Sequence, residues 1–169
     1  MSAHDTSPLA GLGDSLCFAL YSANLACGRA LKPMLDELGL TYTQWFIVLA
    51  LSDEDDQTVT SLGDKLFLDS STLTPVLKKM ERHGIVQRRR SRVDERQVMV
   101  SLTDRGRVLG RQDAGRSLAS ATSLSPAEVV QARMSAVRVR DSLLGELGRR
   151  PAARTKRARL QKRPDPDAA

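Results

Sequence analysis

Aromatic residues make up only 4% of the 169-residue chain, and cysteine and histidine occur twice each. With so few rings the interior must be aliphatic, which suits packed helices better than a sandwich of short strands. His4 and His83 lie far apart and have no ligand partner at a usable spacing, so no metal site is expected. The sequence also lacks a glycine-rich phosphate loop and a paired-carboxylate site. We therefore expect no cofactor and no enzymatic activity.

Long apolar runs are missing as well. No stretch reaches the roughly 18 apolar residues that a membrane span needs. Residues 1–15 contain acidic side chains and no apolar segment of the kind found in signal peptides. These absences predict a cytoplasmic protein whose two cysteines are free thiols. Hydrophobic residues, at 41%, suffice for the core of one domain of ordinary size.

The net charge of +6 belongs to the C-terminal tail. Residues 149–163 hold eight of the 26 basic residues and no acidic one, which leaves 18 residues of each sign in residues 1–148. Total charge is therefore no guide to what the folded part binds, and only local clustering counts. Residues 149–169 are basic and poor in apolar side chains, and residues 1–11 are small and polar. Both segments are predicted to be disordered.

A helical pattern begins near the N-terminus. Apolar residues recur at three- and four-residue spacing from Leu16 to Leu31, which is typical of one face of an amphipathic helix. Asp14 or Ser15 is the candidate N-cap. Pro33 predicts a kink or a break near residue 32, because proline donates no backbone hydrogen bond.

Further periodicities and turn residues predict the rest of the fold. They first indicate a helix over 43–51, capped by Thr43 and with Trp45, Ile47, Val48 and Leu51 in the core, and then a charged loop over 53–56 that stays out of the core. A short helix over 58–66 follows, and then a helix from Ser70 or Ser71 to about His83 that Gly84 ends. After these come a strand opening at 85–86, a charged turn over 91–96, a returning strand over 97–102, a helix capped by Thr103, and a last helix from Pro126 to about Leu147. This order predicts a mainly α fold with a small β-hairpin wing (α+β), a winged helix-turn-helix.

The helix from Ser70 and the following hairpin carry the residues that predict DNA binding. A recognition helix needs small polar groups near its N-terminus, where they reach base edges in the major groove. Basic groups further along position the protein on phosphates, and residues 78–92 contain seven basic groups against one acidic residue, Glu81. Taken singly, such hydroxyl groups are usually helix caps and such basic runs are usually solvated; their order along the chain favours DNA. The candidates are Ser70, Ser71, Thr72, Thr74, Lys78, Lys79, Arg82, Arg88, Arg89, Arg90 and Arg92.

The segment from Leu66 to Ser91, followed by Asp94-Glu95-Arg96 and by residues 102–106, resembles the MarR family of bacterial regulators. The resemblance implies a domain over residues 12–148 that forms a homodimer on double-stranded DNA with a pseudo-palindromic operator. Its DNA-reading part would be residues 58–102, with dimerisation helices over about 14–40 and 104–148. Each wing tip would reach a minor groove. Pro75, Asp94 and Arg96 join the DNA-binding set, Arg96 either as the minor-groove contact or as a brace of the wing.

Four shorter segments, residues 16–21, 32–33, 39–42 and 66–70, resemble the branch of the family that senses organic hydroperoxides, OhrR. In that branch the cysteine that matches Cys17 is the peroxide sensor, and Tyr21 lies in the same motif. A thiolate in the first turn of a helix is favoured by free N–H groups and the helix dipole. The resemblance implies a repressor released from its operator when organic hydroperoxide oxidises Cys17. The alternative reading of Cys17 is a small buried hydrophobe.

The branch typically supplies two tyrosines from the partner subunit to hydrogen-bond the sensor sulfur. Tyr42 matches one of them, whereas Leu31 stands at the other position and has no donor, a loss of about 0.5–1.5 kcal/mol. Cys27 lies ten residues after Cys17, about 15 Å along one helix, too far for a disulfide within that helix. Cys27 is either a resolving thiol across the dimer or an ordinary packing residue. In the second case the expected product is a mixed disulfide with a small cellular thiol.

Three other functions fit parts of the sequence. The first is a MarR-type repressor released by a small aromatic ligand, with Cys17 silent. The second is a thiol peroxidase, although the chain has no Cys-x-x-Cys and no catalytic constellation around Cys17. The third is a protein whose basic tail binds nucleic acid without specificity.

Overall fold

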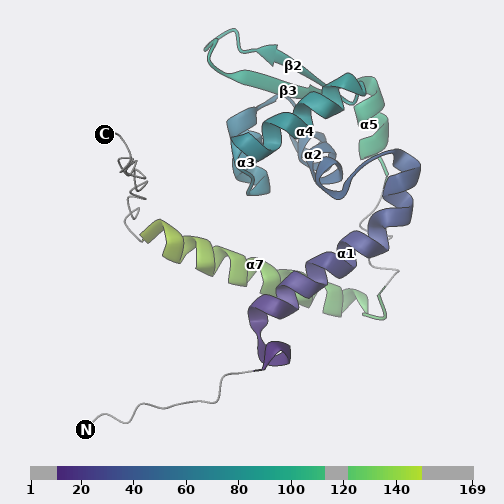
Figure 1. Ribbon diagram of the computed structural model, residues 1–169, viewed down its shortest axis with the longest axis vertical. Helices are drawn as coiled ribbons and strands as arrows, with labels where there is room; N and C mark the ends of the chain where they lie inside the picture. The colour runs from purple at the N-terminus through teal and green to yellow at the C-terminus, as the bar shows by residue number, and fades with distance from the viewer. Residues whose placement is uncertain (1–10, 113–121, 150–169) are drawn as a thin grey trace, which may run out of the picture. The chain divides into compact units, whose positions relative to one another are not determined.

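The computed structural model describes residues 11–112 and 122–149 (Figure 1). The chain divides into two compact units, Met1–Ser125 and Pro126–Ala169, which are described separately. The two segments predicted to be disordered lie almost wholly outside the described residues. Within those residues, no helix is both long and apolar enough to cross a membrane.

The first unit combines helices with a three-stranded sheet. Its elements, in chain order, are η1 (Leu12–Asp14), α1 (Leu16–Leu38), α2 (Tyr42–Asp53), β1 (Gln57–Thr58), α3 (Val59–Leu66), α4 (Ser70–Arg82), β2 (Val86–Arg90), β3 (Val98–Leu102) and α5 (Asp104–Gly110). In the second unit the structure describes α7 (Pro126–Arg149), which begins at the proline expected to open it.

Helix α1 runs unbroken for 23 residues. Ser15 caps it by accepting a hydrogen bond from the Phe18 N–H at 3.3 Å, and Gly39, at φ 67°, ends it. Pro33 lies inside the helix, so the predicted break near residue 32 does not occur. The proline removes one backbone hydrogen bond. Packing of the apolar residues that follow it on α1 holds the helix together, as Leu35 at 3% exposure shows.

Helix α2 supplies much of the core. Trp45, Ile47, Val48 and Leu51 are buried, as predicted. Its cap is Thr41 and not Thr43, because Thr41 and Gln44 form a reciprocal capping box. The Gln44 side chain accepts from the Thr41 N–H at 2.9 Å, and the Thr41 hydroxyl accepts from the Gln44 N–H at 3.4 Å.

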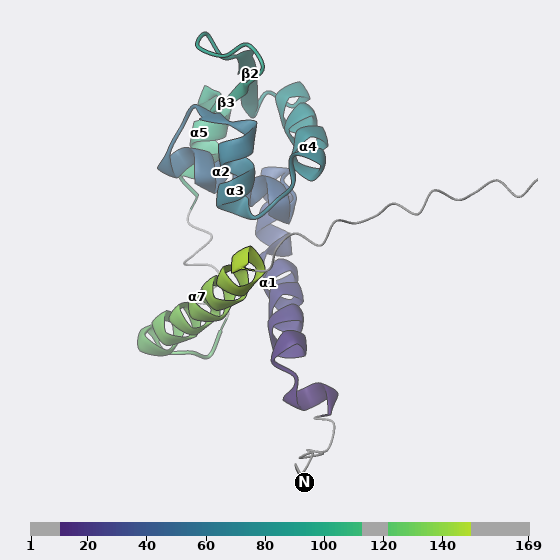
Figure 2. The same cartoon turned by 90° about the vertical axis from the view of Figure 1, so that its left-hand side faces the viewer.

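The strands form an antiparallel sheet in the order β1-β3-β2. Strands β2 and β3 make the predicted hairpin, in register from Val86 opposite Leu102 to Arg90 opposite Val98. Strand β1 was not predicted, because two residues are too short for an alternating pattern. Figures 1 and 2 show the turn of the hairpin projecting beyond the helices, while its base packs on them. Thr103 caps α5, as predicted, by accepting from the Gly106 N–H at 3.1 Å.

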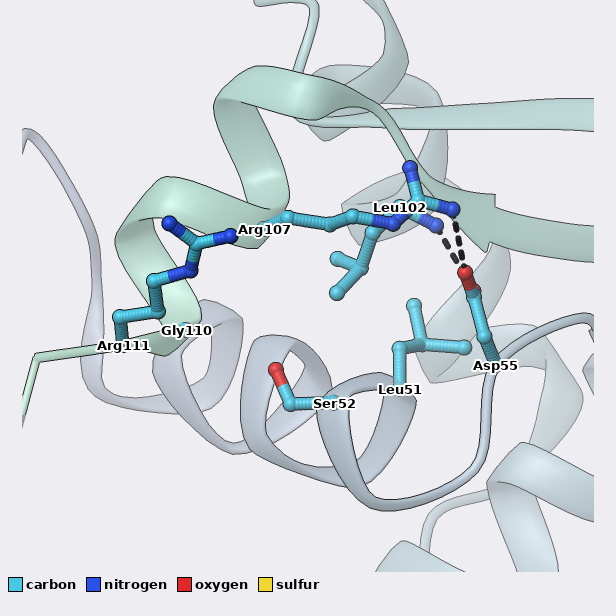
Figure 3. Close-up of a pocket in the computed structure, with 7 residues that line it drawn as sticks. All are labelled: Leu51, Ser52, Asp55, Leu102, Arg107, Gly110 and Arg111. Carbon is cyan, nitrogen blue, oxygen red and sulfur yellow. Dashed lines mark hydrogen bonds and ion pairs between the residues drawn. The ribbon is translucent and has the colours of Figure 1, made fainter.

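The acidic segment at the end of α2, residues 53–56, connects α2 to β3 and α5. The prediction that its charges stay out of the core is wrong for Asp55, which is half-buried. Its carboxylate accepts from the Leu102 N–H at 2.9 Å and from Arg107 at 2.8 Å. Figure 3 shows the Arg107 guanidinium of α5 directed at Asp55, beside a cavity of about 270 Å³ between α2 and α5. Asp55 thereby connects the end of α2 to β3 and to α5.

Candidate nucleic-acid interface

A tight turn joins α3 to α4. The Leu68 N–H donates to the Gly63 carbonyl at 2.9 Å, and a Cβ on Gly63 would lie 2.7 Å from the Leu68 carbonyl oxygen. Only glycine fits so close to a backbone oxygen. Buried Leu62 on α3 and Leu73 on α4 belong to the same core cluster. The two helices therefore form a helix-turn-helix whose second helix is α4.

Helix α4 presents its polar face to solvent. Leu73, Leu77 and Met80 are fully buried, which leaves most of the predicted DNA-binding residues on the opposite face. The exposed ones are Ser70, Ser71, Thr72, Pro75, Lys78, Lys79 and Arg82. The first residue of the helix is Ser70, as predicted, and its N-cap, Asp69, makes no side-chain capping bond.

Thr74 is placed differently from its neighbours on α4. It is half-buried, and its hydroxyl donates to the Ser70 carbonyl at 2.6 Å. A hydroxyl has one proton, so Thr74 offers a base or a phosphate only its acceptor lone pairs. Among the predicted residues of α4, Thr74 is the one already engaged within the helix.

The first two arginines of the wing are paired within the chain. The Arg88 Nε donates to the Glu81 carboxylate at 2.9 Å, and the Arg88 side chain is only 21% exposed. Arg89 forms an ion pair with Asp56, a residue held at φ 58°. Both arginines were predicted to contact DNA; the structure gives each of them an acidic partner that a phosphate would have to displace. The sequence pointed to the charge of Arg89 but not to Asp56, which lies 33 residues away.

The other basic residues predicted to bind DNA make fewer contacts within the chain. Arg90 donates to the Glu95 carbonyl at 3.4 Å, a long contact at an exposed site. In the described part of the chain, no side-chain hydrogen bond or ion pair is formed by Lys78, Lys79, Arg82, Arg92 or Arg96. These cations are available for phosphates.

Asp94 braces the turn of the wing. Its carboxylate accepts from the Arg96 N–H at 3.0 Å and from the Gln97 side chain at 3.2 Å. The Ser91 hydroxyl accepts from the N–H groups of Val93 and Asp94 at 3.2 and 3.3 Å. The bracing contacts at the wing tip thus come from Asp94 and Ser91, whereas the Arg96 side chain lines a groove.

That groove lies between the start of α3, the start of α4 and the base of the wing turn. It has a volume of about 250 Å³ and is lined by Thr58, Val59, Thr60, Ser70, Thr74, Arg88, Arg96, Gln97 and Val98. The groove brings residues of α4 and the wing, 14 or more positions apart in sequence, onto one surface. Of the two guanidinium groups that line the groove, Arg88 is held by Glu81, so Arg96 is the one available to a phosphate.

The predicted sensor cysteine is accessible. Cys17 is the second residue of α1, and its side chain is exposed in this chain. Tyr21, one turn further along, is 61% exposed. Cys17 therefore lies in the first turn of α1, where its sulfur is open to solvent in this chain.

The other redox candidates gather where α1 meets α2. Cys27 is half-buried. The Tyr42 ring lies edge-on to Phe46 at 4.8 Å between centroids and within 4.0 Å of the Cβ position of Gly28. Burial and then the nearby Cys27 raise the pKa of Tyr42 above its usual value of 10.0. Leu31 is only 5% exposed and packs in the core of its own chain.

A larger cavity adjoins Tyr42. It has a volume of about 400 Å³ and an apolar wall, and it is lined by Asn24, Tyr42, Thr43, Phe46, Lys65, Leu66, Phe67 and Leu68. The sequence did not indicate this cavity, because its residues come from three helices. Phe46 is 41% exposed, whereas its neighbours Trp45 and Ile47 on α2 are buried.

Comparison with known proteins identifies relatives of the chain. Residues 29–111 match the family model described as transcriptional regulator SarA/Rot. The organic hydroperoxide resistance transcriptional regulator of Bacillus subtilis is 45% identical over 98 residues, which cover 58% of this chain and 67% of that protein. The regulator TtmR of Methylorubrum extorquens is 50% identical over 103 residues, which cover 60% of this chain. The chain spans only about half (53%) of TtmR.

Solved structures agree with the observed fold. The structure of reduced AbfR bound to DNA superposes with a TM-score of 0.70 at 31% identity, over 80% of this chain and 94% of that one. The reduced form of MarR from E. coli superposes with a TM-score of 0.61 over 74% of this chain and 96% of that one. At 24% identity the second match shows the fold alone. The predicted winged helix-turn-helix is confirmed, and the relatives named are regulators, as expected for a chain that is not an enzyme.

Proposed function

Because the chain belongs to the MarR family of transcriptional regulators, we propose that it is a homodimeric repressor that binds a pseudo-palindromic operator in double-stranded DNA. The observation that carries this proposal is the exposed polar face of α4. Hydroxyl groups lie at its N-terminus, unpaired lysines lie further along, and the braced wing lies beside it. Such an arrangement fits hydroxyls to base edges and cations to phosphates.

Dimerisation is supported by the apolar residues that α1 exposes. In its N-terminal half Leu16, Tyr21 and Leu25 are 57%, 61% and 41% exposed. A single chain gains nothing from presenting a row of large apolar side chains to water, and each square ångström that a second copy covers stabilises by about 25 cal/mol. Helix α7 likewise exposes Val130, Met134, Leu143 and Leu144. We propose α1 and α7 as the dimerisation helices, as the family resemblance implies.

Oxidation of Cys17 is the proposed switch. An organic hydroperoxide transfers one oxygen atom to the Cys17 thiolate, which forms a sulfenate and releases the alcohol. The sulfenic acid then condenses with a second thiol, and the disulfide forms with loss of water. That thiol is Cys27 of the partner subunit or a small cellular thiol. The exposure of Cys17 in the first turn of α1 supports the first step.

The environment of Tyr42 bears on the second step. Tyr42 was assigned from the resemblance as a hydrogen-bond donor to the partner's sulfur, and in this chain it adjoins its own Cys27. If Tyr42 contacts the Cys17 sulfur of the other subunit, that sulfur also lies near Cys27 of the same subunit as Tyr42. Leu31 has no hydroxyl and is packed in the core of its own chain, so it offers the sulfur no second donor.

Binding of a selected palindromic duplex, with and without cumene hydroperoxide, tests the switch. We expect the wild-type protein to lose affinity on oxidation and Cys17→Ser to remain bound. Cys27→Ser separates the two resolving thiols. A dimer-sized band on a non-reducing gel that disappears in Cys27→Ser identifies Cys27, and a monomer-sized band throughout excludes it. A mass increase equal to that of an added small thiol then identifies the mixed disulfide. Release of Cys17→Ser by the hydroperoxide would overturn the switch.

The cavity of about 400 Å³ favours a second candidate function, release by a small aromatic ligand with Cys17 silent. Its size lies within the range of small-molecule sites, and Phe46 and Phe67 offer ring contacts. Release of Cys17→Ser from DNA by benzoate, abolished by Phe46→Ala, would favour this candidate.

Peroxide turnover beyond one equivalent per subunit would instead revive a thiol peroxidase. Loss of all DNA binding on deletion of residues 149–169 would revive non-specific binding through the tail.

A further inference from the structure

The wing presents an apolar side chain at its tip. Val93 is 98% exposed and lies between Arg92 and Asp94. Single exposed hydrophobic residues are common on protein surfaces, but Val93 is held in a fixed turn. Its own N–H donates to the Ser91 hydroxyl at 3.2 Å, and the turn closes through the Ser91 N–H to Gln97 carbonyl bond at 2.9 Å.

The length of the wing sets where this tip lies on DNA. The hairpin is paired from Val86 opposite Leu102 to Arg90 opposite Val98, which spans about 13 Å at roughly 3.3 Å per residue. The turn over residues 91–97 extends it further. Major and minor grooves of B-DNA alternate every half turn, about 17 Å along the axis. With α4 in a major groove, a wing of this length suffices to span the distance to the adjacent minor groove.

We propose that Val93 enters this minor groove and makes the protein prefer A·T over G·C base pairs at the positions beneath it. The inference rests on the proposed binding of DNA through α4. A minor groove of A·T pairs offers only acceptors, whereas guanine adds the N2 amino group, a donor that projects into the groove. Valine has no acceptor for that donor, so a G·C pair would leave the amino group covered and unpaired.

Two arginines near Val93 suit the same site, although Asp94, which braces the turn, and exposed Glu95 lie beside them. Arg92 and Arg96 are both exposed, and neither side chain makes an ion pair in the described part of the chain. A narrow groove over A·T pairs has an enhanced negative potential that attracts guanidinium groups. The arginines thus supply attraction to the groove, and Val93 supplies the selection against the amino group at its floor.

The experiment uses the full chain and a duplex selected from a random library by the wild-type protein. Hydroxyl-radical footprinting locates the minor-groove positions protected by the wing. At these positions A·T is replaced by G·C or by inosine·cytosine, which lacks only the N2 amino group. We expect affinity for A·T and inosine·cytosine to be alike and affinity for G·C to be about tenfold weaker, the usual order for one unfavourable base pair.

Two substitutions at the tip test the residue itself. Val93→Thr keeps the shape of valine and adds an acceptor for the amino group, so the ratio of A·T to G·C affinity should fall toward one. Val93→Ile is the matched control and should retain the ratio. Neither change removes a packing contact, because Val93 is 98% exposed, so both proteins should fold.

The outcomes separate this inference from the proposed function. Failure to select any duplex would contradict DNA binding itself. A duplex bound with specificity, for which Val93→Thr leaves the A·T to G·C ratio unchanged, would overturn only the role of Val93. Inosine·cytosine behaving like G·C would also overturn it, since the amino group would then not be what is sensed.

Discussion

Replacing Asp55 by alanine should destabilise the first unit more than its partial exposure suggests. The Asp55 carboxylate accepts from the Leu102 N–H at 2.9 Å, and Leu102 is only 2% exposed. Removing the carboxylate takes away the acceptor of this buried N–H. The same carboxylate pairs with Arg107 at 2.8 Å, where the two side chains are 32% and 48% exposed.

The two contacts contribute unequally. An unpaired buried N–H costs about 1–3 kcal/mol. The ion pair with Arg107 is well solvated, so it contributes about 0–1 kcal/mol. Asp55→Ala should therefore lower the free energy of unfolding by about 1–4 kcal/mol. Asp55→Asn keeps an acceptor for the Leu102 N–H and loses only the charge, so it should cost less than about 1 kcal/mol.

Urea denaturation followed by circular dichroism measures both variants. Protein concentration must be fixed, because the stability of a dimer depends on it. Glu54→Ala is the matched control: Glu54 is 71% exposed and pairs with Lys65 at 3.7 Å, and its removal should change stability by less than about 0.5 kcal/mol. Equal losses for Asp55→Asn and Asp55→Ala would refute the reasoning, because the ion pair and not the buried N–H would then dominate.

Three further predictions follow from the same structure. Gly106→Ala should destabilise α5 by about 1–3 kcal/mol in a thermal melt, because a Cβ there would lie 2.2 Å from the Ile85 carbonyl oxygen; an unchanged melting temperature would contradict the close packing. In a Tyr21→Phe background, ultraviolet titration should show Tyr42 ionising above pH 10.0, since burial and Cys27 raise its pKa. The neutral phenol is then retained longer in the folded state, so the stability from Tyr42 is complete below pH 10.0 and falls as pH rises through its folded pKa; a midpoint at or below 10.0 would exclude this. Finally, Arg96→Ala should reduce the slope of DNA affinity against salt by about one unit, whereas Arg89→Ala should change it less, because Asp56 already neutralises Arg89; equal slopes would show that DNA displaces Asp56.

Elements with a local cause were predictable from sequence. The start of α1 at Ser15, the end of α4 before Gly84 and the cap of α5 at Thr103 each depend on neighbouring residues alone. The alternation of residues 97–102 similarly indicated the returning strand of the wing. A local signal was incomplete where packing competed with it. Pro33 predicted a kink or a break, and the break does not occur, because Leu31 and Leu35 on either side are held in the core and the helix continues.

At the candidate site, too, some features follow from local sequence and others only from packing. The sequence by itself determined that hydroxyl and basic groups follow one another from residue 70 to residue 96, because composition and order are local properties, and this sufficed to indicate a DNA-binding wing and helix. Only the tertiary structure decided which of those cations are available, because Asp56 and Arg89 meet across 33 residues and Glu81 and Arg88 meet across the start of the wing. An ion pair depends on the distance between its partners in space, and for residues so far apart in sequence that distance is set by the packing of the sheet.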